Sequence, residues 1–171
     1  MDNLKALIRD IPDFPKPGIM FRDLTTLLKS PAGLREAVKA MIDPFATAEI
    51  DLVVGVEARG FIFGVPLALE LDAGFVPARK PGKLPAAKVA AQYALEYGEA
   101  TIEIHKDAIE PGQRVLLVDD LLATGGTMAA ARRLVDELQG EIVGISFLVE
   151  LEALQGREQL SGCRIESAIT Y

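Results

Sequence analysis

With 171 residues, half of them hydrophobic and a quarter charged, the chain is long enough for one globular domain with a substantial core and too short for two. Its formal net charge of −7 at pH 7 argues against binding to nucleic acid or to a membrane, so locally basic loops must bind any anion. The single cysteine excludes an internal disulfide, and neither a signal peptide nor a membrane-spanning run is recognisable, so we expect a cytoplasmic protein.

The first 30 residues differ in character from the rest. Apolar residues at helical spacing predict a short helix over residues 3–9. The next stretch, IPDFPKPGIMFRD (11–23), holds three prolines and one glycine among aromatic residues, which excludes a regular helix and favours an extended segment pinned against the body. Its apolar side chains need cover, either from the core or from a flat aromatic ligand.

Beyond residue 30, strands alternate with helices. This alternation predicts a mainly parallel sheet with helices on both faces, in which ligands gather beyond the carboxyl ends of the strands. The predicted strands are 51–56, 75–78, 100–104, 115–118, 142–149 and 165–169, and the predicted helices are 31–45, 61–71, 128–138 and 150–160.

Two loops after predicted strands could bind anions. The turn Glu57-Ala58-Arg59-Gly60 can offer backbone amides and a guanidinium, although Arg59 could equally form a surface ion pair. The loop RKPGK (79–83) places three cations within five residues, which could neutralise a departing anion or could simply be solvated charge.

The Ala-rich stretch 84–98 ends in Glu96-Tyr97-Gly98. A connection of this length inside a compact domain is usually a lid or disordered, so we expect a flexible lid over about 81–98. A surface acid and a packed hairpin tyrosine are the plainer interpretations of Glu96 and Tyr97. His105 follows the predicted strand 100–104 and is expected to be a solvated strand end. One histidine and one cysteine are too few ligands for a zinc site of the Cys/His type.

The most informative stretch is VLLVDDLLATGGT (115–127). Four apolar residues predict a buried parallel strand, and the small and hydroxyl residues 123–127 precede a helix, whose free N–H groups and positive dipole end favour a phosphate. Asp119 and Asp120 would repel that phosphate if they faced it, so they more plausibly accept hydrogen bonds from vicinal sugar hydroxyls. A ribose 5-phosphate fits this arrangement.

These motifs resemble those of the type I phosphoribosyltransferases. The run at 11–23, EARGF, RKPGKLP, YALEYG and VDDLLATGGT occur in the order found in members that use adenine. The resemblance implies the type I phosphoribosyltransferase fold in one domain over residues 1–171, with an N-terminal hood over about 1–30, a core over about 31–171 and the lid. It further implies a purine-salvage pentosyltransferase that converts phosphoribosyl pyrophosphate and adenine to AMP and pyrophosphate.

The resemblance also implies a role for each matching residue. Arg59, Glu96, Asp119 and Asp120 would take part in catalysis, and Tyr97 would cover the sugar. Ribose 5-phosphate would be bound by Asp119, Asp120, Ala123, Thr124, Gly125, Gly126 and Thr127. Pyrophosphate would be bound by Glu57, Ala58, Arg59, Arg79, Lys80 and Lys83. Adenine would be bound by Met20, Phe21, Arg22 and Leu121. A cis peptide bond is implied at Glu57-Ala58.

Three further expectations come from the family. Mg²⁺ would be required, held mainly by substrate and water rather than by direct protein ligands. A homodimer is implied, with part of the basic loop reaching the neighbouring subunit. Related enzymes for hypoxanthine and guanine usually carry an acid at the position of Ala123, so its absence favours adenine; another purine, such as hypoxanthine, guanine or xanthine, is the alternative.

Two other classes of protein would share some of these features. A non-catalytic regulator that touches DNA would keep the phosphate loop but should carry a basic helical extension, which this acidic chain lacks. A plain nucleotide-binding module would need neither Arg59 nor a lid. Formation of AMP would separate these classes from an enzyme.

Overall fold

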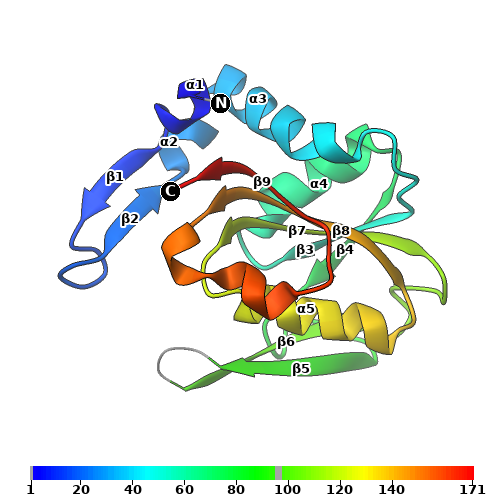
Figure 1. Ribbon diagram of the computed structural model, residues 1–171. Helices are drawn as coiled ribbons and strands as arrows, with labels where there is room; N and C mark the ends of the chain where they lie inside the picture. The colour runs from blue at the N-terminus through cyan, green and yellow to red at the C-terminus, as the bar shows by residue number, and fades with distance from the viewer. Residues whose placement is uncertain (1, 95–97) are drawn as a thin grey trace.

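A five-stranded parallel sheet forms the centre of the molecule (Figure 1). The computed structural model describes residues 2–94 and 98–171. The strands stand in the order β4-β3-β7-β8-β9, and each neighbouring pair is parallel, which confirms the predicted α/β architecture. Their bounds are β3 Leu52–Val56, β4 Gly74–Ala78, β7 Arg114–Leu122, β8 Glu141–Glu150 and β9 Ile165–Thr170.

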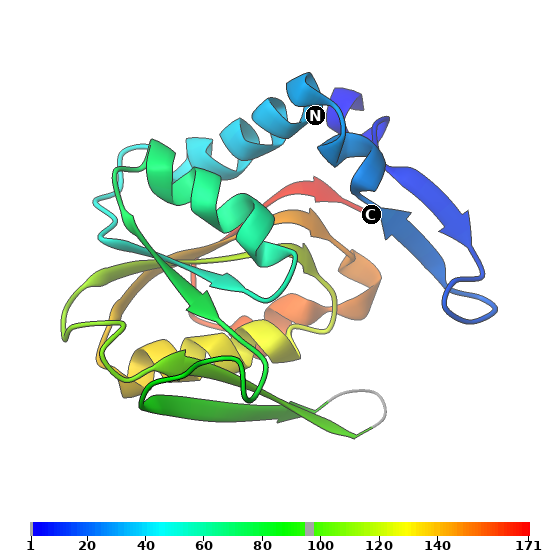
Figure 2. The ribbon, with the colours of Figure 1, turned by 180° about the vertical axis from the view of Figure 1, so that it is seen from behind.

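Helices cover both faces of this sheet (Figures 1 and 2). On one face, α3 (Pro31–Ile42) and α4 (Gly60–Glu70) pack against alternate strand residues such as Val53 and Leu116. On the other face, α5 (Gly126–Glu137) packs against the intervening residues, such as Val54 and Leu117. Because both faces are buried, the interiors of β3, β7 and β8 are mainly runs of apolar residues rather than alternating patterns.

The α3 helix begins where the sequence predicts. Ser30 is its N-cap, with the side chain accepting a hydrogen bond from the Gly33 N–H at 3.2 Å, and Pro31 occupies the first turn. The helix ends at Ile42, and the short 3₁₀ helix η1 (Asp43–Phe45) follows.

The hood is an antiparallel hairpin rather than a single extended segment. It comprises α1 (Asp2–Lys5), β1 (Arg9–Pro12), β2 (Met20–Asp23) and α2 (Thr25–Leu28), and its hairpin projects beside the end of β9 (Figure 1). The helix predicted over 3–9 is therefore too long. Arg9 belongs to β1 because it pairs with Asp23 across the hairpin.

The stretch predicted as a long lid connection contains a strand that the prediction missed. Strand β5 (Lys88–Ala94) pairs along its length with β6 (Glu99–His105), and this hairpin lies against α5. Val89 and Ala91 point inward, while Lys88, Ala90 and Gln92 are exposed. Alanine has a low strand propensity, so the Ala-rich composition concealed this period of two.

The predicted helix over 150–160 is also wrong. Strand β8 continues to Glu150, and two short 3₁₀ helices follow, η2 (Glu152–Leu154) and η3 (Gly156–Leu160). Gln155 lies between them with a φ of +52°, a left-handed conformation that a continuous α-helix does not contain. Within residues 2–94 and 98–171, no helix has the length and apolar character needed to cross a membrane.

The hairpin of the hood is held by a buried carboxylate. Asp23 accepts hydrogen bonds from Nε and Nη2 of Arg9 at 3.0 and 2.5 Å and from the Thr25 N–H at 2.9 Å. These bonds, chiefly those from Arg9, lower the pKa of Asp23 from its ordinary 3.8 to about 2.

We expect the Asp23→Asn variant to be less stable than the wild type at neutral pH. Because the folded-state pKa is depressed, the contribution of Asp23 is fully present above pH 3.8 and is lost as the pH falls toward about 2. Thermal unfolding of both proteins, followed by circular dichroism across this range, should show the difference in Tm shrinking with acid. A difference independent of pH would contradict this account. Asp43→Asn, which removes an exposed ion pair with Lys39, is the control.

Candidate active site

The best candidate for a site lies where two neighbouring strands send their helices to opposite faces of the sheet. Strand β3 leads into α4 on one face, and its neighbour β7 leads into α5 on the other. In an open parallel sheet, such a switch point leaves a crevice beyond the carboxyl ends of the strands. A cavity of about 440 Å³ occupies this position, and we call it the central cavity. It is lined by Val56, Glu57, Ala58, Arg59, Lys80, Tyr93, Asp119, Asp120, Leu121, Ala123 and Thr127.

The two acids stand inside β7 rather than in a loop after it, because the strand continues to Leu122. Asp120 is buried, and its Oδ2 lies 2.5 Å from Nε of Arg59 in an ion pair that lacks the alignment of a hydrogen bond. Asp119 accepts a hydrogen bond from the Asp120 N–H at 2.8 Å. Desolvation raises the pKa of Asp119 well above its ordinary range, and the neighbouring Asp120 carboxylate raises it further.

The loop after β7 forms a second, smaller pocket beside the central cavity. Residues 121–128 surround a volume of about 70 Å³, together with Asp119 and Phe147. Gly125 is the N-cap of α5 and has a φ of +85°, a conformation that favours glycine. The first N–H groups of the helix have no partner within it, so this pocket can bind an anion about the size of a phosphate.

The backbone around this pocket is packed too closely for side chains. A Cβ on Gly125 would lie 2.4 Å from the Gly156 carbonyl oxygen, and a Cβ on Gly156 would lie 2.3 Å from the Ala123 carbonyl oxygen. Both glycines are thus required by close backbone contact. Sequence reasoning identified Gly125 but missed Gly156, which carries no local motif.

The turn after β3 presents one arginine to the central cavity and holds another nearby. The Glu57-Ala58 peptide bond is cis, which confirms that expectation. Arg59 lines the cavity, while Arg79 donates to Glu57 at 3.1 and 3.4 Å. The hydrogen bond from Arg79 lowers the pKa of Glu57, which also accepts from the Lys80 N–H at 3.1 Å.

The basic loop is therefore divided among three environments. Lys80 lines the central cavity, Arg79 is bound to Glu57, and Lys83 is exposed outside the lining of that cavity. Tyr93 is a lining residue that the sequence analysis missed. It lies on the same face of β5 as Val89 and Ala91, so recognition of that strand would have indicated its direction.

The hood covers a separate cavity of about 450 Å³, which we call the hood cavity. Its walls are mainly apolar, and Phe14 packs edge to face on Phe21, with ring centroids 5.1 Å apart. Of the residues proposed for the base, Phe21 and Arg22 line this cavity, Leu121 lines the central cavity, and the Met20 side chain is half exposed. Arg59 lines both cavities and forms the wall between them.

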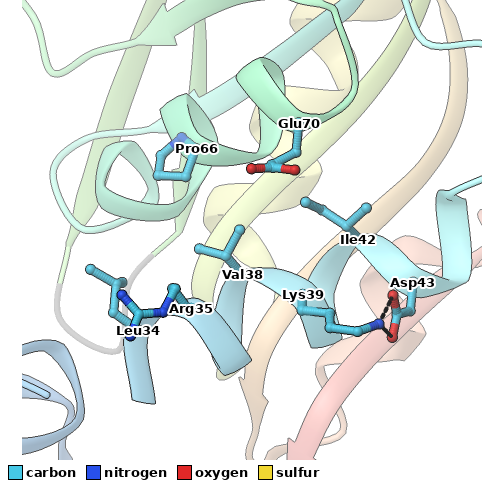
Figure 3. Close-up of a pocket in the computed structure, with 8 residues that line it drawn as sticks. All are labelled: Leu34, Arg35, Val38, Lys39, Ile42, Asp43, Pro66 and Glu70. Atoms are coloured by element: carbon cyan, nitrogen blue, oxygen red, sulfur yellow. Dashed lines mark hydrogen bonds and ion pairs between the residues drawn. The ribbon is translucent and has the colours of Figure 1, made fainter. Parts of the chain in front are cut away.

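A cavity larger than these lies elsewhere. A groove of about 590 Å³ runs between α3 and α4, with Val38 and Ile42 between the helices and the Lys39–Asp43 ion pair at its rim (Figure 3). It contains neither an acid pair nor an anion-binding turn. Although this groove is larger, it lacks the reactive and anion-binding groups of the central cavity.

Two predicted residues, Glu96 and Tyr97, lie outside the described residues. Within residues 2–94 and 98–171, no three side chains of histidine, cysteine, aspartate or glutamate gather in a group that could hold a metal ion. The carboxylates that line the central cavity are those of Asp119, Asp120 and Glu57.

A parallel sheet, an acid pair at a switch point and a phosphate-sized loop at a helix N-terminus together define a phosphoribosyltransferase, and residues 23–166 match the phosphoribosyl transferase domain. Adenine phosphoribosyltransferase from Thermosynechococcus vestitus is 58% identical over 169 residues, covering 99% of both chains. The enzyme of that name from Halothermothrix orenii is 59% identical over 159 residues, covering 93% of this chain and 94% of its own. This chain belongs to the adenine phosphoribosyltransferase family.

Solved structures agree with this assignment. The crystal structure of adenine phosphoribosyltransferase from Thermoanaerobacter pseudethanolicus superposes with a TM-score of 0.96 at 49% identity, covering 99% of each chain. The Saccharomyces cerevisiae enzyme, solved with an imino-altritol bisphosphate and adenine, superposes with a TM-score of 0.92 at 40% identity, covering 98% and 97%.

We expect Gly125→Ala to weaken binding of ribose 5-phosphate by at least about tenfold, because the new Cβ would displace the loop whose amides face the anion. Gly162→Ala is the matched control: Gly162 has the same φ of +85° but open space at its Cβ position, so the change costs only the backbone term of about 1 kcal/mol. Calorimetric titration would give the Kd for ribose 5-phosphate of both variants, and their Tm values would give the loss of stability. Equal losses in the two variants would show that the backbone contact is unimportant.

Proposed function

We propose that this protein transfers the 5-phosphoribosyl group from phosphoribosyl pyrophosphate to adenine, giving AMP and pyrophosphate. The observation that carries the proposal is the central cavity, in which an acid pair, a cationic turn and a phosphate-sized pocket adjoin one another. The names of the relatives support the same reaction.

The charges of the cavity suit displacement at a ribose carbon. The sugar gains positive character as its bond to pyrophosphate breaks, and the leaving group gains negative charge. Asp119 and Asp120 would accept hydrogen bonds from the sugar hydroxyls, and Arg59 and Lys80 would stabilise the diphosphate. The amides of residues 123–127 would bind the 5-phosphate and so fix the sugar between the two groups of charges.

We propose Mg²⁺ as the accompanying cation. The carboxylates of Asp119 and Asp120 are hard oxygen donors within the central cavity and can accept hydrogen bonds from the waters of such an ion. When bound to the diphosphate, magnesium neutralises part of its charge. Arg59 and Lys80 would hold the remaining phosphate oxygens.

The hood cavity is the proposed site for adenine. Its apolar walls, including Phe21 and Ile62, suit the faces of a purine. Strand β2 is paired on one side only, with β1, so its other edge carries main-chain groups that can bind the polar edge of a base near Met20 and Arg22. At position 123 the chain offers a methyl group and no acid, which favours adenine over an oxopurine.

One assay tests the proposal against its alternatives. The purified protein is mixed with Mg²⁺, phosphoribosyl pyrophosphate and one base: adenine, hypoxanthine, guanine or xanthine. AMP formed with adenine alone supports the proposal. Product with an oxopurine alone would select the runner-up, and no product with any base would favour a regulator or a binding module. The catalytic role of Glu96, the covering role of Tyr97 and the cytoplasmic location stay predictions.

We expect alanine at both Asp119 and Asp120 to lower kcat/KM by at least about 100-fold without unfolding the protein, because the hydrogen-bond acceptors for the ribose are lost. Initial rates would be measured beside a circular dichroism melt. Asp136→Ala is the control, since this exposed acid pairs with Arg132 on α5. Near-normal activity of the double variant would remove the sugar-binding role.

We also propose that the protein forms a homodimer through the outer face of α4. Val65 and Leu69 project from this helix at 42 and 77% exposure, and their i, i+4 spacing places both apolar side chains on one face. The exposed position of Lys83, outside the cavity lining of its own chain, leaves it free to reach a partner subunit.

Light scattering coupled to size-exclusion chromatography should find a dimeric wild type. We expect Val65→Glu combined with Leu69→Lys to give a monomer, because charged residues would be buried in the interface. Leu154→Lys, at another exposed leucine, is the control and should leave the mass unchanged. A dimeric double variant would place the interface elsewhere.

A further inference from the structure

The pocket for the 5-phosphate rests on a segment that is distant in sequence. The Gly156 carbonyl oxygen occupies the space that a Cβ on Gly125 would need, and the Ala123 carbonyl oxygen occupies the space that a Cβ on Gly156 would need. The β-carbon of Gln159 lies 3.1 Å from the Cβ position of Gly125. Because the two backbones touch without intervening side chains, a displacement of η3 displaces the loop 123–126.

One arginine holds η3 in place. Arg157 donates from Nε and Nη2 to the two carboxylate oxygens of Glu150, both at 2.7 Å. It also donates to the Ile165 carbonyl oxygen at 3.1 Å and to the Ser167 hydroxyl at 3.4 Å. A single guanidinium thus joins η3 to the end of β8 and to β9, so the segment behind the phosphate loop is fixed to the sheet.

The partner of this arginine is a buried charge. Glu150 is 5% exposed, and the hydrogen bonds from Arg157 hold its pKa below the usual range, while the same contact raises the pKa of Arg157. Both groups therefore stay charged at neutral pH. The Glu150 side chain is buried and that of Arg157 is half exposed, so desolvation offsets part of the attraction, but a bidentate fork fixes the relative orientation of the two partners.

The pair acts at a distance from the reacting groups. Neither Arg157 nor Glu150 lines the central cavity, the phosphate pocket or the hood cavity. Arg157 reaches the site through Gly156, which directly precedes it, and Glu150 lies opposite Leu122 of the phosphate pocket in the β7–β8 pairing. Any effect on the reaction must therefore be one of positioning.

We propose that Arg157 and Glu150 are positioning residues for the 5-phosphate, setting the loop 123–126 through η3. The proposal rests on the proposed function, because it assigns the pocket to the phosphate of the phosphoribosyl donor. It gives the ion pair a role in donor affinity that a purely stabilising contact would lack.

The test uses Arg157→Lys, which keeps the charge but loses the fork, and Glu150→Gln, which keeps the shape but loses the charge. In both, we expect the KM for phosphoribosyl pyrophosphate and the Kd for ribose 5-phosphate to rise about tenfold, because the loop amides lose their alignment. The KM for adenine and kcat should stay within about twofold of the wild type. Glu141→Gln breaks the pair with Arg114 at the opposite end of the sheet. It should leave both KM values and the Kd for ribose 5-phosphate unchanged.

The outcomes are distinguishable. Unchanged donor KM and ribose 5-phosphate Kd in variants that remain folded at the assay temperature would overturn the positioning role. Equal weakening of adenine and donor, in step with a fall in Tm, would overturn it too, since it would indicate a general loss of structure. If the wild type itself forms no AMP, the proposed function has failed, whereas normal wild-type turnover with unaltered variants rejects this inference alone.

Discussion

The ion pair between Arg59 and Asp120 brings a cation to the end of a strand that would otherwise bury two adjacent negative charges. Strand β7 carries Asp119 and Asp120 at the edge of an apolar core, where desolvation penalises the Asp119 carboxylate and the neighbouring Asp120 raises the cost of ionising it further. The compensating guanidinium comes from the turn after β3, the neighbouring strand in the sheet. The acid pair is therefore compatible with this fold only because the two strand ends meet.

The same neighbourhood explains the arrangement of the site. The helices after β3 and β7 lie on opposite faces, which opens the space that Arg59, Lys80 and the acids line. Asp119 lines both the phosphate pocket at the start of α5 and the central cavity, and Asp120 pairs with Arg59 of the cationic turn. A ligand with a phosphate at one end and a diphosphate at the other matches this sequence of charges.

Much of this was predictable from the sequence because the signals are local. Apolar runs identified the strands of the central sheet, and the residue types of 123–127 indicated an anion pocket wherever the chain placed it. The features that the sequence analysis missed are those determined by tertiary contacts. Strand β5 is stabilised by pairing with β6 despite its alanines, and Gly156 is required by close contact with Leu122 and the Ala123 carbonyl, which are distant in sequence. None of these contacts leaves a mark within a short window of sequence.

The shared wall between the two cavities has a thermodynamic consequence. Arg59 borders both, so a molecule entering either one meets the same guanidinium, and the ordering of that side chain is required once rather than twice. Where a ligand in one cavity changes the position of Arg59, it changes the affinity of the other cavity, and linkage requires that the effect be reciprocal and of the same factor. One shared side chain is thus the physical link through which the two compartments can influence each other.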